Sequence, residues 1–440
     1  MIRDLLPAIV ACLLAGTPAC SGDATSPQTD PPGTTTPPPD QPPPNAAATG
    51  TIAYARGSSI RLVEPDGSGD RALWSAPNPQ PGYSARGLVW NPAGAELAFS
   101  SDHEMATSLY ERDIFTVSGD GRRLRKLTNG PSHAELVALP KGDVTVRVQN
   151  NSRDAGPYVV YVVGAAAPLS VLVPPGTTKT LTFTGVADLG NTSQLAVAVY
   201  GAFRWYGAAS ADVRPASTVD AGLLVVGSAG LEHLGAEGPA WRSDGSKVAF
   251  ISGAGTCALR QVRADPPPGV SAEPLLHPEF PGIVCAYDWA PVTSRASELL
   301  IAETDFGAGR GSISQVTEGS RARGATLVTY ESFTQLLDLR WLPDGSGFLF
   351  SAKRYGSVFN ENGNIYEYTF ATKAVRQVTR FENEFVRAFS ISPDGQRVAL
   401  ERATAIDAPT SDVWVMRRDG SDLRLVARDA RAPAWNPKRP

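Results

Sequence analysis

The chain has 440 residues, which is too long for one ordinary compact core unless that core is built from repeated units. Its 40 Lys and Arg residues stand against 44 Asp and Glu residues, so no basic excess is left to neutralise a phosphate backbone, and nucleic acid is not expected as a partner. With 42 Gly, 37 Pro and only 3 Met, the composition favours many short strands joined by turns over long helices.

The first 19 residues have the pattern of an export signal. Arg3 precedes an apolar stretch over residues 5–16 that is too short to span a bilayer stably. The sequence TPACSG around Cys20 resembles the lipobox of bacterial lipoproteins, in which the cysteine is acylated and becomes the mature N-terminus. We therefore expect a signal peptide over residues 1–19 and lipidation of Cys20; ordinary cleavage after Ala19 is the alternative. The resemblance implies an exported protein, anchored by its lipid in the bacterial envelope, in the periplasm or at the outer membrane.

Residues 21–50 contain many prolines and almost no large apolar side chain. Such a segment cannot form a core, and polyproline stretches make a semi-rigid tether. We predict that residues 20–50 are a linker between the lipidated cysteine and a folded head.

A short motif recurs through the rest of the chain: an aromatic residue in five of six copies, one spacer and, in most copies, a turn related to Pro-Asp-Gly. The copies are WNPAG at Trp90, WRSDG at Trp241, WAPVTS at Trp289, WLPDG at Trp341, ISPDG at Ile391 and WNPKRP at Trp435. A short apolar strand follows all but the last copy, and further strands come after it. Four strands in a period of about 50 residues indicate the blade of a β-propeller.

The Pro-Asp-Gly triplet has a physical role in a tight turn. Pro presets the first central position, Asp can accept a bond from nearby backbone N–H groups, and Gly tolerates a positive φ. We interpret these aspartates as turn formers rather than metal ligands or catalytic groups. The Trp or Ile before each turn is expected to pack between neighbouring blades.

The order of W-x-P-D-G turn, apolar strand, second strand ending in a D-G turn and R-x-L-T strand resembles the TolB-type, WD-like propeller repeat of bacterial envelope proteins. The resemblance covers residues 51–130 and 235–440. It implies a scaffold role among envelope proteins. TolB itself carries a separate N-terminal α/β domain, in whose place this chain has the Pro-rich linker.

The two ends of the repeat region complement each other. Residues 51–63 begin with a second strand and have no motif ahead of them, whereas residues around Trp435 provide a first strand with nothing after it. We expect the C-terminal strand to complete the blade that begins at Thr51 and so close a ring of six blades. Blades 1 and 2 would occupy residues 51–133, and blades 3 to 6 with the closing strand residues 231–440.

One interval between motifs is too long for a single blade. Trp90 and Trp241 are 151 positions apart, and residues 134–230 show alternating apolar residues without the blade motif. We predict an inserted, immunoglobulin-like β-sandwich here, with two degenerate blades as the alternative. The predicted fold class is therefore all-β: a six-bladed propeller closed by the C-terminal strand, with a β-sandwich insertion.

The predicted insertion leaves the ring on the face that also carries the long loops 101–112, 352–363 and 402–411. Binding is commonly found on such irregular rims. The candidate binding residues on this rim are Asp102, His103, Glu104, Tyr110, Glu111, Arg112, Arg354, Tyr355, Asn360 and Glu361.

No motif for catalysis, a metal or a cofactor stands out. The chain lacks G-x-S-x-G, and its four histidines show no paired metal spacing. We therefore assign no catalytic or metal-binding residue and expect no cofactor. Cys257 and Cys285 are predicted to form a disulfide between neighbouring blades, with two buried free thiols as the alternative.

The leading hypothesis is a monomeric, lipid-anchored propeller that binds an envelope protein or a glycan through the face carrying the insertion, without chemical turnover. The alternative is a carbohydrate-active lyase or glycosidase that uses the rim carboxylates as acid and base.

Overall fold

The structure is a computed structural model. It describes residues 50–440 outside a set of excluded positions, and nothing below concerns those. The excluded positions are 78–83, 105–107, 109–111, 131, 154, 191–192, 200–203, 228–230, 233–234, 253–257, 267–271, 277–282, 306–309, 332–334, 354–362 and 439–440.

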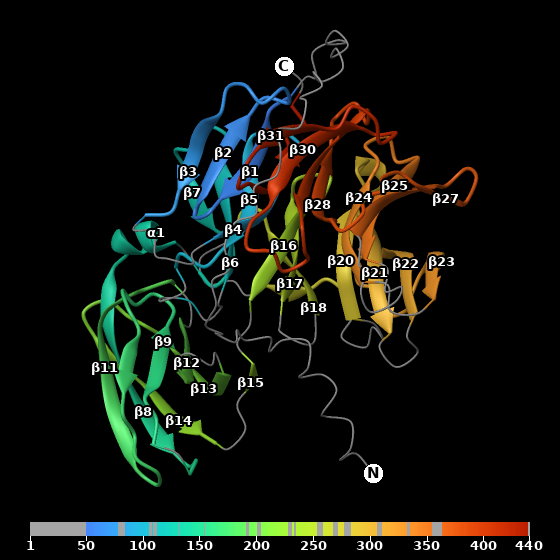
Figure 1. Ribbon diagram of the computed structural model, residues 1–440. Helices are drawn as coiled ribbons and strands as arrows, with labels where there is room; N and C mark the ends of the chain where they lie inside the picture. Colours follow the sequence, from blue (N-terminus) through green and yellow to red (C-terminus); the bar gives the residue numbers. More distant parts are fainter. Residues whose placement is uncertain are drawn as a thin grey trace, which may run out of the picture. The chain divides into compact units, whose positions relative to one another are not determined.

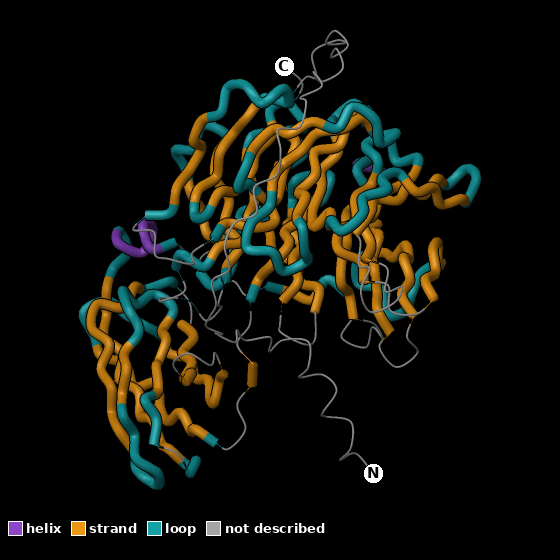
Figure 2. The backbone as a smooth tube through the Cα atoms, in the orientation of Figure 1, coloured by secondary structure: helices purple, strands orange, loops and turns teal. Residues whose placement is uncertain are grey.

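The described chain is almost entirely β-structure (Figure 2). Two short helices interrupt it, α1 (His133–Val137) and the 3-10 helix η3 (Thr293–Arg295). Within the described ranges, no helix is both long and apolar enough to cross a membrane.

Six strands form the framework, and five of them end on the tryptophan of the motif while the sixth ends on its isoleucine. They are β4 (Ala85–Trp90), β16 (Ala236–Trp241), β20 (Ile283–Trp289), β24 (Gln335–Trp341), β28 (Phe385–Ile391) and β32 (Arg431–Trp435). Each contacts the next in that order, and β32 contacts β4, so these inner strands form a closed cycle.

Each inner strand begins a set of four antiparallel strands. The first set is β32-β1-β2-β3, with β1 (Ile52–Arg56), β2 (Ser59–Val63) and β3 (Arg71–Ser75). The second is β4-β5-β6-β7, with β5 (Glu96–Ser101), β6 (Asp113–Ser118) and β7 (Leu124–Lys126), and the third is β16-β17-β18-β19, with β17 (Lys247–Ser252), β18 (Ala258–Arg263) and β19 (Glu273–Pro274). The fourth is β20-β21-β22-β23, with β21 (Glu298–Asp305), β22 (Arg310–Thr317) and β23 (Ala325–Glu331). The last two are β24-β25-β26-β27, with β25 (Gly347–Lys353), β26 (Gly363–Thr369) and β27 (Ala374–Gln377), and β28-β29-β30-β31, with β29 (Arg397–Ala403), β30 (Asp412–Arg417) and β31 (Arg424–Ala427). A single parallel bridge, Gly363 to Phe385, merges these last two into one eight-stranded sheet.

The C-terminal strand pairs with the first strand of the described chain, as expected from the sequence. In the β1–β32 ladder, Ile52 lies opposite Trp435 and Ala53 opposite Ala434. The first strands of the ring, blue, and the last, red, therefore lie next to each other (Figure 1). The pairing covers the strand edges that each end of the chain would otherwise expose.

The aspartates of the motif form turns, as predicted. The Asp344 carboxylate accepts the Ser346 N–H at 2.9 Å, and Gly345 has a φ of 73°. The Asp244 and Asp394 carboxylates accept the N–H two residues on in the same way. Positive φ favours glycine because it has no Cβ to clash, which explains why Gly closes these turns.

The motif tryptophans pack between neighbouring sheets, which confirms that prediction as well. Trp341 shares an apolar cluster with Ala286 of the preceding inner strand and Phe348 of its own sheet. Trp289 shares one with Ala240 and Ala249 in the same manner. A four-stranded sheet has too little core of its own, so these shared side chains supply much of the buried surface.

Strands between residues 141 and 232 pair only with each other among the described residues. One sheet has the order β10-β9-β12-β13-β15 and the other β11-β8-β14. Their strands are β8 (Lys141–Asn150), β9 (Tyr158–Val162), β10 (Leu169–Val171), β11 (Thr178–Ala187), β12 (Ser193–Val199), β13 (Arg204–Ala211), β14 (Thr218–Val226) and β15 (Leu231–Glu232). The pairing thus extends two residues beyond the predicted limit at 230, and β14 runs parallel to β8.

Strand β9 is buried on both of its faces. Val160 and Val162 belong to the apolar cluster between the two sheets of residues 141–232. Val159 and Tyr161 belong to another cluster, which also contains Ile114 and other side chains of the ring strands. A strand buried on both sides is typical of a central layer, so these sheets are joined to the ring by an apolar contact and not only by the chain.

Ring closure predicts that a disulfide can be introduced between β1 and β32. Ala53 and Ala434 are opposite each other in the ladder, where Cα separations suit a disulfide. We expect the Ala53→Cys, Ala434→Cys double variant to form the bridge quantitatively under mild oxidation, as measured by mass spectrometry of a tryptic digest. Alkylation of the two introduced thiols, at positions 53 and 434, in the folded, oxidised protein would contradict the closure.

Candidate functional site: the axial pocket

The cycle of inner strands has two different ends. At the end where the inner strands stop, which we call the turn face, the six copies of the motif come together. Because successive strands are antiparallel, the connections β5–β6, β25–β26 and β29–β30 lie at the opposite end, the loop face. The chain leaves β7 and returns to β16 on the loop face, so residues 141–232 are attached there.

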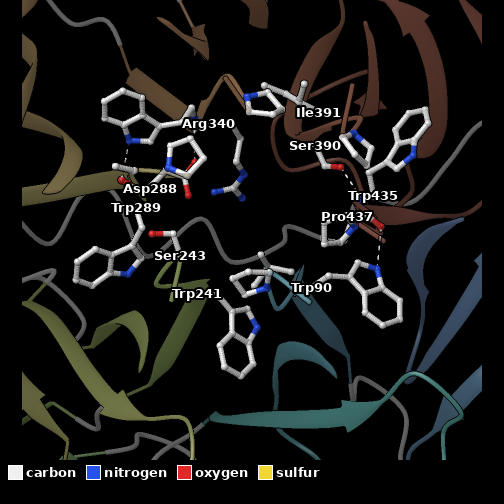
Figure 3. A pocket seen from close by; sticks show the side chains of 18 of the residues that line it. Trp90, Trp241, Ser243, Asp288, Trp289, Arg340, Ser390, Ile391, Trp435 and Pro437 are labelled. Carbon is white, nitrogen blue, oxygen red and sulfur yellow. Dashed lines mark hydrogen bonds between the residues drawn. The ribbon is translucent and has the colours of Figure 1, made fainter. Parts of the chain in front are cut away.

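A pocket of about 410 Å³ lies at the turn face, in the middle of the ring. All six inner strands contribute to its lining (Figure 3). The lining residues at the motif positions are Trp90, Trp241, Trp289, Trp341, Ile391 and Trp435, together with Pro92, Ser243, Pro291, Pro343, Pro393 and Pro437 two positions later. The pocket therefore has a repeated wall in which Ser243 is the one departure from proline.

The tryptophans contribute edges rather than open ring faces to this wall. The exposed fractions of Trp90, Trp241, Trp289, Trp341 and Trp435 lie between 2% and 6%. The Trp90 indole N–H donates to the Ala434 carbonyl at 3.2 Å, and that of Trp341 to the Asp288 carbonyl at 3.3 Å. These bonds fix the rings in the gaps between sheets and leave the proline rings as the accessible surface.

Arg340 and Asp288 are the charged residues of the lining. The Arg340 guanidinium extends towards the centre of the pocket (Figure 3). Its Nη2 lies 3.1 Å from Oδ1 of the buried Asp338, and its Nε donates to the Phe389 carbonyl at 3.4 Å. The Asp288 carboxylate accepts the Trp341 backbone N–H at 2.9 Å.

Burial shifts the pKa values of Asp288, Asp338 and Arg340. It raises the pKa of Asp288 to about 6, although the nearby Arg340 guanidinium acts in the opposite direction. Burial also raises the pKa of Asp338, again against Arg340. For Arg340, burial alone would lower the pKa, but the two carboxylates outweigh it and the pKa lies above its usual value. Arg340 is thus a permanent cation, and Asp288 changes charge near pH 6.

The described part of the predicted loop-face rim is internal rather than open. Asp102 is 8% exposed and accepts the Ser84 N–H at 2.9 Å. Arg112 forms an ion pair with Glu237 at 2.5 Å. The His103 ring packs on Phe115 at 4.3 Å, and burial, with the Lys126 ammonium, lowers its pKa to about 4. These side chains hold the loop together.

Glu104 connects this loop to helix α1. Its carboxylate accepts the His133 N–H at 3.0 Å and lies 3.4 Å from the ammonium of Lys126. Lys126 is 5% exposed and also pairs with Asp113 at 3.2 Å. A buried ammonium with two carboxylate partners is a structural arrangement. The helix itself was missed from the sequence, although Ser132 and Glu135 form the S-x-x-E capping box that signals one.

The remaining sequence predictions concern residues about which the structure says nothing. Tyr110, Glu111, Arg354, Tyr355, Asn360 and Glu361, like Cys20 and Cys257, lie outside the described residues. Cys285 lies in β20, but its side chain is not described. Lipidation, the disulfide and the facing of the two loops stay predictions. In the part of the chain that the structure covers, no group of three or more His, Cys, Asp or Glu side chains is placed to hold a metal ion.

Sequence reasoning missed the axial pocket even though it found the residues that line its wall. The motif was interpreted through its turn and its packing, and both interpretations are correct. The available signal was the repeated Pro two positions after the aromatic residue, because six equivalent turns on one ring must converge on its axis.

Comparison with known proteins finds likeness at the level of solved structures. No family model matches the chain, and no curated protein matches it. TolB from Acinetobacter baumannii matches with 14% identity and a TM-score of 0.49, over 89% of this chain and 68% of that one. A chain of a nidogen/laminin complex matches with 10% identity and a TM-score of 0.45, over 88% and 98%. An oligogalacturonate lyase in complex with manganese matches with 14% identity and a TM-score of 0.36, over 87% and 86%. TolB, whose repeat the sequence resembles, is thus among the structures that match.

The raised pKa of Asp288 predicts a pH-dependent effect of its replacement. The folded pKa of about 6 exceeds the usual 3.8, so the group favours folding fully below pH 3.8 and loses that contribution as the pH rises through 6. Asp288→Asn stays neutral and can still accept the Trp341 N–H. We expect the free energy of unfolding of the variant, relative to wild type, to rise as the pH is raised from 3.8 to 6, the range between the two pKa values, in urea unfolding. A relative stability that does not change with pH, or falls as pH rises, would contradict the assignment.

Removal of the Asp338 side chain should be far more damaging. Asp338→Ala leaves the Phe389 N–H and the Arg340 guanidinium without their buried acceptor. We expect a loss of about 3 kcal/mol in the free energy of unfolding, whereas Asp344→Ala, in an exposed turn, should cost about 1 kcal/mol or less. Equal effects of the two changes would show that the buried carboxylate has no special role.

Proposed function

We propose that the protein is a binding protein built on a six-bladed propeller with an inserted β-sandwich, and that it binds an envelope protein or glycan partner without converting it. The observation that carries this proposal is the axial pocket, where six copies of one motif place a small concave surface with a single Arg and a single Asp among its lining residues. Concave, mostly apolar sites with a few fixed polar groups are the usual form of a ligand site. This places the proposed site on the turn face, whereas the sequence had favoured the loop face.

The catalytic alternative has less support from the described residues. Acid–base catalysis on the rim requires carboxylates that can reach a substrate. Asp102 and Glu104 are instead engaged with Ser84, Lys126 and the start of α1. In the axial pocket, Asp288 is the carboxylate among the lining residues, so a pair of carboxylates across a glycosidic bond is not offered there.

The proposed place of action is the bacterial envelope, with attachment through a lipid on Cys20. This part rests on the TPACSG sequence and on the Pro-rich segment that follows it. We further propose that the protein acts as a monomer.

Site-specific photo-crosslinking tests the proposed function. A photoreactive residue in place of Ile391, on the pocket rim, should form adducts with a partner in cells producing the full-length chain. Pro343→Trp fills the pocket and should abolish the adducts, while the matched change Pro175→Trp, in an exposed turn of the insertion, should leave them intact.

Two results would contradict the proposal. Adducts formed only by a photoreactive residue at Thr180, on the exposed side of β11, would move the site to the insertion. Turnover of a polysaccharide by the purified protein, lost on Glu104→Gln, would make it an enzyme.

A further inference from the structure

The floor of the axial pocket has unused donors and unused acceptor capacity side by side. A guanidinium has five N–H groups. Three of those of Arg340 point to the Phe389 and Leu339 carbonyls and to Asp338. One N–H on each terminal nitrogen is left, and the side chain is 25% exposed. The Asp288 carboxylate accepts the Trp341 N–H and has lone pairs left for a second donor.

The charges and the free donors of the pocket floor, which Arg340 and Asp288 form, favour a neutral ligand over an anion or a cation. Above pH 6, Arg340 is balanced by Asp338, and Asp288 adds a further negative charge. A carboxylate ligand would be repelled by the net negative charge, whereas an ammonium could pair with Asp288 but has no acceptor for the free N–H groups of Arg340. A neutral group that accepts a bond from Arg340 and donates one to Asp288 satisfies both residues. An amide has this combination on adjacent atoms.

The wall favours an aliphatic side chain over a sugar ring. A pyranose needs a flat aromatic face on which to stack, and the five tryptophans expose only 2% to 6% of their surface. The accessible wall consists of proline rings and aliphatic groups such as Val89 and Ile391. A volume of about 410 Å³ is near the lower limit for ligand pockets, enough for one side chain and its adjoining amide.

We propose that the axial pocket binds a segment of polypeptide, with a neutral amide held between Arg340 and Asp288 and an adjoining aliphatic side chain against the proline wall. This inference rests on the proposed function and narrows its partner from a protein or glycan to a protein.

The test uses three small probes with purified full-length protein: N-acetyl-leucinamide, N-acetyl-leucine and methyl glucoside. Binding is followed by the shifts of the tryptophan indole signals in NMR spectra. At pH 8 the amide should bind with a dissociation constant in the range of about 1–10 mM, and the acid about tenfold more weakly. Methyl glucoside should not bind.

The preference for the amide should depend on the charge of Asp288. The charged groups around this carboxylate are Arg340 and Asp338, both on β24, and Arg340 stays charged throughout. At pH 5 the tenfold preference should disappear as Asp288 is protonated. Asp288→Asn should abolish it at pH 8 as well, by strengthening binding of the acid. Asp344→Asn, a matched change outside the pocket, should leave the preference unchanged. The pH series on wild-type protein keeps the test valid if the Asn variant fails to fold.

The outcomes separate the two proposals. The peptide inference would be overturned if methyl glucoside bound in place of the amide, or if the acid bound as tightly as the amide at pH 8. Pocket-dependent adducts at position 391 would then still support the proposed binding function. Adducts at position 391, together with indole signals that do not shift with N-acetyl-leucinamide up to about 50 mM, would likewise overturn the peptide inference and leave the binding function standing. Absence of both adducts and shifts would overturn both proposals.

Discussion

The free edge of the inner strands is the constraint on which this structure depends. Each inner strand pairs with one neighbour in its own sheet, and its other edge faces the next sheet around the ring. Buried backbone groups on that edge require partners. Each of the six junctions is bridged by a hydrogen bond between a side chain, as donor or acceptor, and a backbone group of the neighbouring sheet. The donor and acceptor residues are Trp90 to Ala434, Ser100 to Ala236, Tyr287 to Gly238, Trp341 to Asp288, Phe389 to Asp338 and Trp435 to Ser390.

The axial pocket follows from the same constraint. Holding the inner strands in a ring brings the ends of all six together, so each turn that follows them adds its residue to one wall. Asp288 and Asp338 serve the junctions by accepting the N–H groups of Trp341 and Phe389, and both lie beside Arg340. The groups that close the ring therefore also determine the charge of the pocket. A change that alters ligand preference there is expected to affect stability too.

Much of the fold was predictable because its determinants are local. The Pro-Asp-Gly turns and the apolar runs after them are complete within a few residues, and the sequence therefore located strands such as β25 and β29 to within two residues. Pairing of the strand ending at Trp435 with β1 was also predictable, because one blade lacked a strand that the other end of the chain supplied.

The features that were missed depend on contacts between distant segments. That Asp102 and His103 are internal is determined by Ser84, Phe115 and Lys126, and no spacing within the loop 101–112 reveals these partners. Arg340 was not singled out, because its position on the axis appears only when all the inner strands are in place. The double burial of β9 required both the ring strands and the second sheet of residues 141–232.

Native-state hydrogen exchange of the backbone amides of Trp341, Phe389 and Trp435 tests the central claim most directly. These amides lie on the free edge of their strands, which is not paired within the sheet, and are protected only if the Asp288, Asp338 and Ser390 side chains bridge the junctions. The account predicts that all three exchange slowly and with the same opening free energy, because the ring opens as one unit. Rapid exchange of these amides, while amides within the four-stranded sets stay protected, would show that the side chains do not hold the ring closed.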